Sequence, residues 1–468
     1  MSGIAEVLSN LGYQVSGSDL TRSTAVEHLE SVGIKIFIGH AAANITNGSD
    51  QQTTSPTKTA SVIVTSSAVS EDNIEVVTAR QLGIPVIPRA QMLAELMRMK
   101  YGIAVAGSHG KTTTTSLIAW LVSGAAMNPT VIIGGKVQTA ASGAIVGAGD
   151  FLIAEADESD GSFNLLRPAI SIVTNIDAEH LGYYGSFAKL EEAFHQFMQA
   201  VPFYGLVVAC GDDPVVRRIA AASGRRVITY GLSPNNQIHI SDVEEIDNTM
   251  KFQVRSNETC HGEFLLPLPG MHMASNALAA IAVAIELGVP VDTIRALLKT
   301  FPGVTRRSEC IAEVGKVLIL DDYGHHPTEI RATLNAFRKG MLKARQQTYN
   351  EAKIITIFQP HRYSRTNELF SEFLSAFAAS DIVLITDIYA AGETPLNDIN
   401  SEALAKALDH NACQFVSDLN SAARVATNLV QPGDIVVTMG AGNVRSVGLA
   451  IAEHLKKINN DHEQESIQ

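Results

Sequence analysis

A glycine-rich turn, Gly107-Ser-His-Gly-Lys-Thr112, places the strongest constraint on what this chain can fold into. The apolar run at residues 101–106 predicts a buried strand ahead of the turn, and an apolar helix is predicted to follow it. In a strand–turn–helix unit of this kind, backbone N–H groups of the turn and of the helix N-terminus face phosphate groups, and the lysine adds a positive charge. The turn therefore predicts an α/β domain that binds a nucleotide.

The residues inside the turn favour this interpretation, although their spacing is not the standard one. The early glycine of such a motif would fall at Val105, so Gly107 supplies the flexibility here. Lys111 is expected to reach the phosphates, and the hydroxyl of Thr112 is expected to reach Mg²⁺. A glycine-rich turn with a purely structural role is the alternative.

Short apolar strands alternate with helices along the whole chain, which indicates parallel sheets covered by helices. Apart from the strand at the turn, strands are expected at residues 13–19, 34–38, 61–64, 151–154, 170–174, 205–209, 317–320, 354–358, 382–386 and 435–438. A plausible hinge lies at residues 301–303. Three α/β domains are the simplest interpretation, at residues 1–97, 98–301 and 302–468.

Composition limits the class of protein. The chain has 468 residues and a formal net charge of −13, with 48 Asp and Glu against 35 Lys and Arg. This balance argues against broad binding of nucleic acid or of anionic membranes. The four cysteines include no Cys-x-x-Cys pair, no apolar stretch is long enough to cross a bilayer, and no signal-peptide pattern is present. We therefore expect a cytoplasmic protein without membrane insertion.

Carboxylates gather after the strand at residues 151–154. The segment Glu155-Ala-Asp-Glu-Ser-Asp160 holds four of them, and like charges this close repel unless a cation neutralises them. Because Mg²⁺ prefers carboxylate and water ligands, we expect a metal site with Glu155 as the preferred ligand. A solvated acidic loop is the alternative. His180 follows the next strand, where it is expected either to cap or pack, or to bind a second metal ion.

Ionic and aromatic residues follow the strands of the last part of the chain. Arg306 and Arg307 stand at the hinge, and the segments Asp321-Asp-Tyr-Gly-His-His-Pro-Thr-Glu329 and Gln359-Pro-His-Arg-Tyr-Ser-Arg365 each follow a strand. Open α/β sheets bind ligands at the carboxyl ends of their strands, and arginines hold carboxylates or phosphates there. Gly270-Met-His-Met-Ala-Ser-Asn276, at the start of an Ala-rich helix, fits close packing and contact with a nucleotide base equally well.

Together these motifs resemble those of the Mur ligases, ATP-dependent enzymes that form amide bonds in peptidoglycan synthesis. The resemblance covers nearly the whole chain and is carried by the glycine-rich turn, the acidic segment, the two segments of the last part and Thr174-Asn-Ile-Asp-Ala-Glu-His180. The two segments of the last part are typical of the member that adds L-alanine. The resemblance implies an N-terminal Rossmann-like UDP-binding domain, a central P-loop ATPase-like domain and a C-terminal Rossmann-like domain.

The reaction implied by the resemblance joins L-alanine to the lactyl carboxylate of UDP-N-acetylmuramate through an acyl phosphate, releasing ADP and phosphate. The implied catalytic residues are Lys111, His180, Arg306, His325 and His361. ATP is expected at Gly107, Ser108, His109, Gly110, Lys111, Thr112, Thr113, Asn276 and Arg306, and Mg²⁺ at Thr112, Glu155 and His180. The substrate-binding residues would be Tyr323, His325, His361, Arg362 and Arg365. A monomer or a weak homo-oligomer is expected.

Two departures from the family pattern change these expectations. An asparagine is common in the family where this chain has Met273, so no asparagine role is carried to that position. Family members also have a strand and a glycine-rich turn ahead of the Ser-Gly-Ile-Ala-Glu-Val-Leu segment that opens this chain. We therefore expect an open sheet position in the first domain and weakened binding of the UDP-sugar.

Three other functions compete with this interpretation. A recycling ligase that attaches a whole tripeptide to the same UDP-sugar would share the turn and the acidic segment. A P-loop switch or kinase without ligase chemistry would not need the ionic segments of the last part. A non-catalytic UDP-sugar-binding protein is the third, and it depends on the altered N-terminus.

Overall fold

The computed structural model describes residues 1–46, 60–66, 68–133, 144–246, 248–257, 259–396 and 399–465, with side chains up to residue 459. Contacts divide the chain into two compact units. The first contains Met1–Ser241, Gln253–Gly262 and Ser275–Leu298, and the second contains Asp242–Phe252, Glu263–Ala274 and Lys299–Gln468. Each unit has hydrophobic cores of its own.

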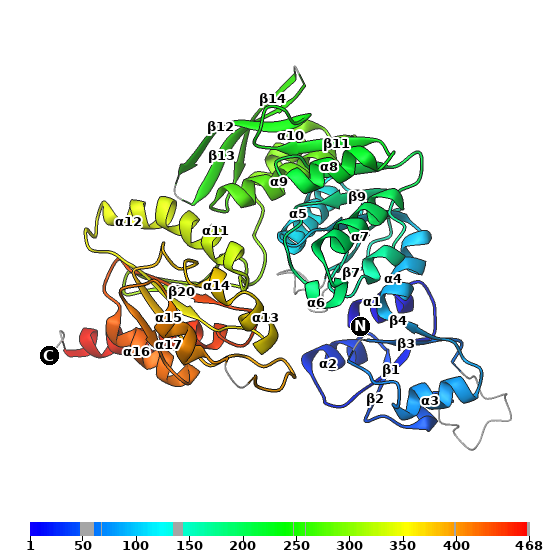
Figure 1. Cartoon of the computed structure of the whole chain (residues 1–468), viewed down its shortest axis with the longest axis horizontal. Helices are drawn as coiled ribbons and strands as arrows, with labels where there is room; N and C mark the ends of the chain where they lie inside the picture. The colour runs from blue at the N-terminus through cyan, green and yellow to red at the C-terminus, as the bar shows by residue number, and fades with distance from the viewer. Residues whose placement is uncertain are drawn as a thin grey trace. The chain divides into compact units, whose positions relative to one another are not determined.

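The N-terminal part of the first unit contains two short parallel strand pairs. β1 (Ser16–Asp19) pairs with β2 (Lys35–Ile38), and β3 (Ile63–Thr65) pairs with β4 (Val86–Pro88). They form two separate sheets, so β1 and β3 each have a single strand neighbour among the residues that the structure describes. Figure 1 shows both pairs in the blue part of the chain. The open sheet position expected in the first domain stays a prediction.

Helices alternate with these strands along the chain. They are α1 (Ser2–Asn10), α2 (Thr24–Ser31), α3 (Ile74–Gln81) and α4 (Arg89–Arg98), with a 3₁₀ turn η1 (Ala42–Asn44). α1 buries Ile4 and Val7, spaced three residues apart on one helix face. α2 begins where the Ser23 hydroxyl accepts the N–H of Val26, which satisfies one of the unpaired donors of a helix start.

The chain also contains a ten-stranded sheet. Its order is β14-β13-β12-β11-β10-β9-β5-β8-β6-β7. The strands are β5 (Tyr101–Ala106), β6 (Thr130–Ile132), β7 (Ala144–Ile145), β8 (Phe151–Glu155), β9 (Ile170–Val173), β10 (Leu206–Cys210), β11 (Val227–Gly231), β12 (Ile238–Ile246), β13 (Thr249–Ser256) and β14 (Thr259–Leu266). β5 lies between β8 and β9 and is parallel to both, so the three carboxyl ends meet at one edge.

Helices and short turns connect these strands. They are α5 (Lys111–Gly124), η2 (Ser162–Leu165), α6 (Leu181–Tyr184), α7 (Phe187–Gln199), α8 (Pro214–Ala222), α9 (Met271–Glu286) and α10 (Val291–Lys299). The core beneath them includes Phe163, whose ring centroid lies 5.1 Å from those of both Phe194 and Phe197.

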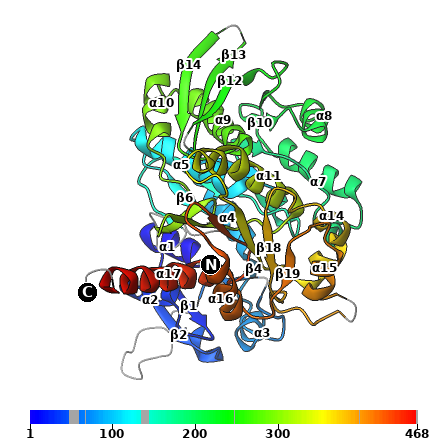
Figure 2. The same ribbon diagram turned by 90° about the vertical axis from the view of Figure 1, so that its left-hand side faces the viewer.

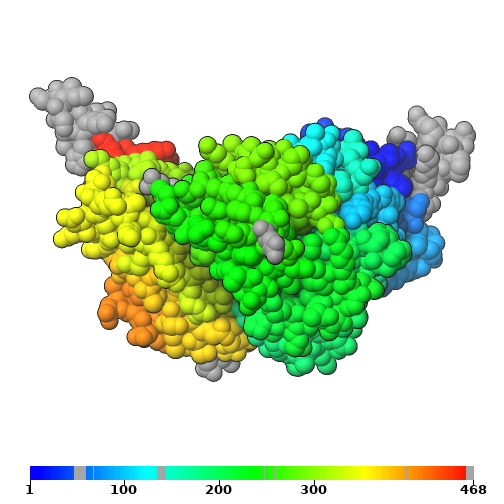
Figure 3. Space-filling model, turned by 90° about the horizontal axis from the view of Figure 1, so that it is seen from above, coloured from blue at the N-terminus to red at the C-terminus, as the bar shows by residue number. Residues whose placement is uncertain are grey.

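The strands β12–β14 lie outside those expected from the sequence. β13 alternates buried and partly exposed residues, with Met250, Phe252 and Val254 buried. That period of two is typical of a strand with one covered face, and it is the signal that could have located this element. Figure 3 shows this stretch, green in the colour scale, as part of the molecular surface.

The second unit contains a six-stranded sheet of order β15-β16-β20-β17-β18-β19. The strands are β15 (Glu309–Val314), β16 (Val317–Asp322), β17 (Ile354–Phe358), β18 (Ile382–Ile385), β19 (Cys413–Phe415) and β20 (Ile435–Met439). β15 runs antiparallel to β16, and the other pairs are parallel. The four strands expected here are confirmed, and β15 and β19 are additional.

Helices cover both faces of this second sheet. They are α11 (Pro327–Phe337), the π-helical segment η3 (Arg338–Leu342), α12 (Lys343–Gln346), α13 (Tyr363–Glu368), α14 (Phe370–Phe373), α15 (Ser401–Ala407), α16 (Leu419–Leu429) and α17 (Arg445–Glu465). One core contains α11 and α15 residues, and a separate core contains α16 and α17 residues. Figure 2 shows α16 and α17 side by side. A sheet with helices on both faces is the doubly wound arrangement predicted for this part.

Candidate active site

The glycine-rich turn lies between β5 and α5, at the edge where the carboxyl ends of β5, β8 and β9 meet. We call Gly107 to Thr112 the phosphate loop. Gly107 has φ +135° and Gly110 has φ +81°, in the region that favours glycine. A Cβ on Gly107 would lie 2.0 Å from the Thr174 hydroxyl oxygen. Val105, where the standard motif has glycine, is instead a buried β5 residue.

Lys111, the first residue of α5, reaches back across the phosphate loop. Its Nζ donates to the carbonyl oxygens of Gly107 at 2.5 Å and Ser108 at 3.1 Å, and to Glu158 Oε1 at 2.8 Å. Burial acts to lower the pKa of Lys111, but the charges of Glu158 and the neighbouring carboxylates outweigh it, so the pKa is raised. The side chain therefore keeps a full positive charge beside the helix N-terminus, where an anion is stabilised.

Glu158 is the buried partner of this lysine. Its side chain is 2% exposed, and burial raises its pKa to about 7 against the opposing effect of Lys111. Within the described part of the chain, Glu158 Oε2 is buried and has no hydrogen-bond partner. A carboxylate oxygen of this kind lacks the compensation that burial of a charge requires, and a cation would supply it.

Potential metal ligands form a group beside Lys111. Ligand atoms of Glu158, Glu179 and His180 all lie within 4.8 Å of one another, and His180 Nε2 is 3.7 Å from a carboxylate oxygen of each glutamate. The two other expected ligands pair with each other, since the Thr112 hydroxyl donates to Glu155 Oε1 at 2.6 Å. The donors are hard oxygens with one imidazole, which fits a divalent cation such as Mg²⁺.

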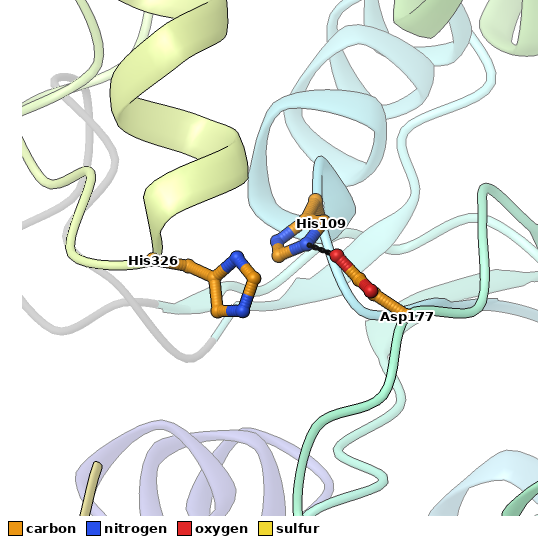
Figure 4. A group of neighbouring side chains, drawn as sticks. All are labelled: His109, Asp177 and His326. Carbon is orange, nitrogen blue, oxygen red and sulfur yellow. Dashed lines mark hydrogen bonds and ion pairs between the residues drawn. The ribbon is translucent and has the colours of Figure 1, made fainter. Parts of the chain in front are cut away.

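Other predicted nucleotide residues also lie at the phosphate loop. His109 Nε2 is 3.1 Å from Asp177 Oδ2, as the dashed line in Figure 4 shows. A Cβ on Gly110 would meet Asn276 Oδ1 at 2.6 Å, so this α9 side chain contacts the loop. Ser108 and Thr113 are buried. The structure thus brings all the predicted ATP residues of the first unit to one place.

In the second unit, the two aspartates that end β16 are buried, and Asp321 pairs with Arg306. Arg306 Nε donates to Asp321 Oδ2 at 3.0 Å, and its terminal nitrogens donate to the carbonyl oxygens of Gly440 and Gly442. Burial raises the pKa of Asp322 to about 6, although the charge of Arg307 opposes this. Arg306 is therefore bound within its own unit, and a contact with ATP stays a prediction.

The predicted substrate residues of the second unit come together at the carboxyl ends of β16 and β17. The rings of Tyr323 and His325 lie 5.5 Å apart, and those of His325 and His361 lie 6.1 Å apart. Arg365 lies 3.2 Å from His361 Nδ1. Tyr389, which was not predicted, stacks on His361 with centroids 5.5 Å apart.

Both histidines of this group are held neutral. Burial, opposed by the Glu329 charge and aided by Arg365, lowers the pKa of His325 to about 3. Burial and the same arginine lower the pKa of His361 to about 4. Arg362 adds a positive charge next to them, with an exposed side chain and φ +68°. The group therefore combines cationic arginines with uncharged imidazoles at neutral pH, which suits a ligand that carries a carboxylate.

Several site residues were not singled out from the sequence. Glu158 lies inside the predicted acidic segment, yet only the fold shows that it pairs with Lys111. Glu179 lies next to the predicted His180, so its proximity in sequence was an available signal. Tyr389 follows a predicted strand, and its position at a carboxyl end was the signal that could have found it.

The chain belongs to the Mur ligase family, a family of ligases. Its residues 1–101 match the catalytic domain of the Mur ligase family, residues 105–284 match the Mur ligase middle domain, and residues 306–442 match the glutamate ligase domain of Mur ligases. The chain therefore contains three Mur ligase domains, and it is an enzyme.

Similar proteins cover almost the whole chain. The UDP-N-acetylmuramate–L-alanine ligase of Geotalea uraniireducens is 48% identical over 97% of this chain and 96% of its own length. The ligase of the same name from Geobacter sp. strain M21 is 47% identical over 97% and 95%. The crystal structure of UDP-N-acetylmuramate-alanine ligase from Thermotoga maritima matches with a TM-score of 0.76 and 27% identity, covering 98% of this chain and 96% of that one.

Proposed function

We propose that this enzyme uses ATP to join L-alanine to the lactyl carboxylate of UDP-N-acetylmuramate, releasing ADP and phosphate in peptidoglycan biosynthesis. Support comes from the names of the relatives that match almost the full chain. The observation that carries the proposal is Lys111 at the start of α5, paired with the buried Glu158 and surrounded by the phosphate loop. Because ATP and the nucleotide sugar are cytoplasmic metabolites, we place the reaction in the cytoplasm.

The phosphate loop would bind the β- and γ-phosphates of ATP. The first-turn N–H groups of α5 have no intrahelical acceptors, and the helix dipole favours negative charge there. The positive charge of Lys111 would offset the charge that develops when the substrate carboxylate takes the phosphoryl group. The acyl phosphate formed in this way is the activated species that the alanine amine attacks, releasing phosphate.

Residues that fit a divalent cation lie in the same unit. Glu158, Glu179 and His180 would hold one ion, and Thr112 and Glu155 are the residues proposed for an ATP-bound ion. The cation would neutralise phosphate charge during transfer. The buried Glu158 oxygen without a hydrogen-bond partner in the described structure is the feature that favours an ion at this place.

The second unit would supply the amino-acid site. We assign the carboxylate of L-alanine or of the muramoyl group to Arg362 and Arg365, because an arginine fork matches a carboxylate. Tyr323, His325 and His361 would line this site as uncharged hydrogen-bonding groups, since the pKa values of both histidines lie well below neutrality. The low pKa values make both imidazoles poor bases at pH 7, so their contribution would be to position the amine and the carboxylate.

An ADP-release assay tests the proposal. The purified chain is supplied with ATP, Mg²⁺ and UDP-N-acetylmuramate, and ADP is measured with L-alanine, with glycine, with the tripeptide of the recycling reaction, or with no amine. We expect release that requires both the UDP-sugar and L-alanine. Release that requires the tripeptide would favour the recycling ligase, and release without the UDP-sugar would contradict ligase activity.

Lys111→Met is the matched test of the phosphate loop. It removes the positive charge, and Glu158 can then take up a proton because its pKa is already about 7, so the fold is expected to survive. We expect kcat/KM to fall by about three orders of magnitude, since such a charge contributes to transition-state stabilisation. Lys406→Met, at a side chain that is 74% exposed, is the control and should retain full activity. Equal activity of the two variants would contradict the role of Lys111.

A further inference from the structure

The phosphate loop is held from one side by the segment that follows β9. Asn175 Oδ1 accepts the backbone N–H of His109 at 2.8 Å, and Asn175 Nδ2 donates to the carbonyl oxygen of the same residue at 3.1 Å. The Thr174 hydroxyl donates to that carbonyl oxygen at 2.6 Å. The backbone N–H and the backbone carbonyl oxygen of His109 are therefore both hydrogen-bonded by the side chains of two neighbouring residues, Thr174 and Asn175.

The residues on either side of this contact add to it. The N–H of Ser108 donates to the carbonyl oxygen of Asn175 at 3.0 Å, and the Ser108 hydroxyl accepts the N–H of Asp177 at 2.8 Å. Asp177 also meets the imidazole of His109, as Figure 4 shows. We call Thr174, Asn175 and Asp177 the loop clamp.

This arrangement decides which N–H groups of the loop can meet a ligand. The N–H groups of Ser108 and His109 are bound to the loop clamp. The N–H groups of the first turn of α5 are left without intrahelical acceptors. An anion at this loop would therefore be bound by the start of α5, with residues 108 and 109 serving as its fixed support.

We propose that Asn175 is the positioning residue of the phosphate loop: its carboxamide holds the His109 backbone so that the first turn of α5 faces the phosphates of ATP. Holding the His109 backbone in this way requires one side chain that accepts the N–H and also donates to the carbonyl oxygen. The carboxamide of asparagine has both an acceptor oxygen and a donor nitrogen, so it meets this requirement. The same segment runs on to His180, so the support of the loop and a potential metal ligand share one short stretch of chain. The inference rests on the proposed use of ATP.

Two variants of Asn175 distinguish the contributions of the two hydrogen bonds that its side chain makes to His109. Asn175→Ala removes both, and Asn175→Asp keeps an acceptor for the His109 N–H but sets a negative charge against the His109 carbonyl oxygen. We expect at least a tenfold rise in the dissociation constant of Mg-ADP, measured by calorimetry, for both variants. The KM for ATP should rise in parallel, while the KM for L-alanine stays within twofold of the wild type.

Amide hydrogen exchange in the ligand-free protein tests the clamp without any nucleotide. We expect the amide of His109 to exchange faster in Asn175→Ala and to keep its protection in Asn175→Asp, because only the first loses the acceptor. Asn235→Ala, at an exposed asparagine of the same unit, is the control and should change neither exchange nor binding. Wild-type Mg-ADP affinity in Asn175→Ala would overturn the inference.

Two variants of Thr174 test the clamp independently, in case the Asn175 variants misfold. Thr174→Val removes the hydroxyl donor to His109, whereas Thr174→Ser restores it. We expect weakened Mg-ADP binding in the first and recovery in the second, and equal affinity of the two would count against the clamp. If the wild-type chain itself fails to bind Mg-ADP, the proposed use of ATP is wrong, and the exchange rates alone then decide whether Asn175 holds the loop.

Discussion

Buried ionisable side chains in this molecule owe their charge states to their neighbours. Lys111 stays charged because Glu158 lies 2.8 Å away, whereas His325 and His361 are neutral because burial removes water and arginines stand beside them. Lysine, histidine and glutamate are readable from the sequence, but their pKa values depend on distances that the fold sets. For single residues, the sequence therefore gives the type of ionisable group, and the fold sets its charge state.

Replacement of His325 by glutamine should make the chain less sensitive to acid. The folded-state pKa of about 3 lies below the ordinary value of 6.5, so the unfolded chain binds the proton first as the pH falls. Stability contributed by the neutral imidazole is present above pH 6.5 and is lost as the pH falls from there toward 3. Between pH 7.5 and pH 5, this loss amounts to about 2 kcal/mol. Over the same pH range, the stability of His325→Gln should therefore fall by about 2 kcal/mol less than that of the wild type.

Urea unfolding at pH 7.5 and pH 5 measures this difference. His195→Gln, at the surface of α7, is the control and should follow the wild type at both pH values. If His325→Gln lost as much stability as the wild type, the imidazole would have to be protonated in the folded chain.

At the scale of elements, the strand–turn–helix unit depends on two backbone conformations. Gly107 and Gly110 take positive φ values where β5 ends and α5 begins, and close neighbours leave no room for a Cβ at either position. Glycine at the first of these positions, two residues after the standard one, still allows the turn. The motif is therefore defined by the conformation that the backbone needs more than by its spacing.

Two glycine substitutions separate backbone strain from crowding. Gly224→Ala adds a Cβ at φ +68° with nothing within 4 Å, so we expect a loss of about 1 kcal/mol of stability from strain alone. Gly107→Ala adds the strain and a Cβ 2.0 Å from the Thr174 oxygen, and it should cost about 2–4 kcal/mol and weaken Mg-ADP binding. Chemical denaturation and calorimetry measure both effects. Equal losses for the two variants would show that the Thr174 side chain moves aside freely.

At the scale of the whole molecule, the sheets differ in how completely their strands are paired. β5 and β20 each lie between two parallel strands, whereas β1 and β3 each have one neighbour among the described residues. Two-stranded sheets are marginal on their own and depend on the helices packed against them. Among the described residues, no helix is both long and apolar enough to cross a membrane.

Amide exchange should therefore be faster in the N-terminal sheets than in the central one. We expect amides of β1 and β3 to exchange at least a hundredfold faster than those of β5 and β9, because local opening requires less free energy where one edge is unpaired. Exchange detected by mass spectrometry of the whole chain measures this, with β20 as a second protected reference. Similar protection of β1 and β5 would show that the helices alone stabilise the N-terminal pairs.

The sequence predicted the parts whose signals are local. The turn at 107–112, the buried strands β5, β8, β9, β10, β16, β17, β18 and β20, and the ionic segments after β16 and β17 follow from residue types at fixed spacing. β12–β14 were not predicted because polar residues alternate with apolar ones along them, so they contain no continuous apolar run of the kind that marks β5 or β17. Glu179 and Tyr389 were not predicted because each has a partner that is distant in sequence. Glu179 meets Glu158, and Tyr389 stacks on His361.

What the sequence by itself determined is the chemistry available: a lysine and threonine after a glycine-rich turn, carboxylates after a strand, and arginines with histidines at later strand ends. What only the tertiary structure decided is which of these groups meet. Glu158 rather than Glu155 pairs with Lys111, Asn175 binds both polar groups of His109, and Arg306 is bound within its own unit. The physical reason is that hydrogen bonds and charge effects act over a few ångströms, and chain folding sets such distances between residues far apart in sequence.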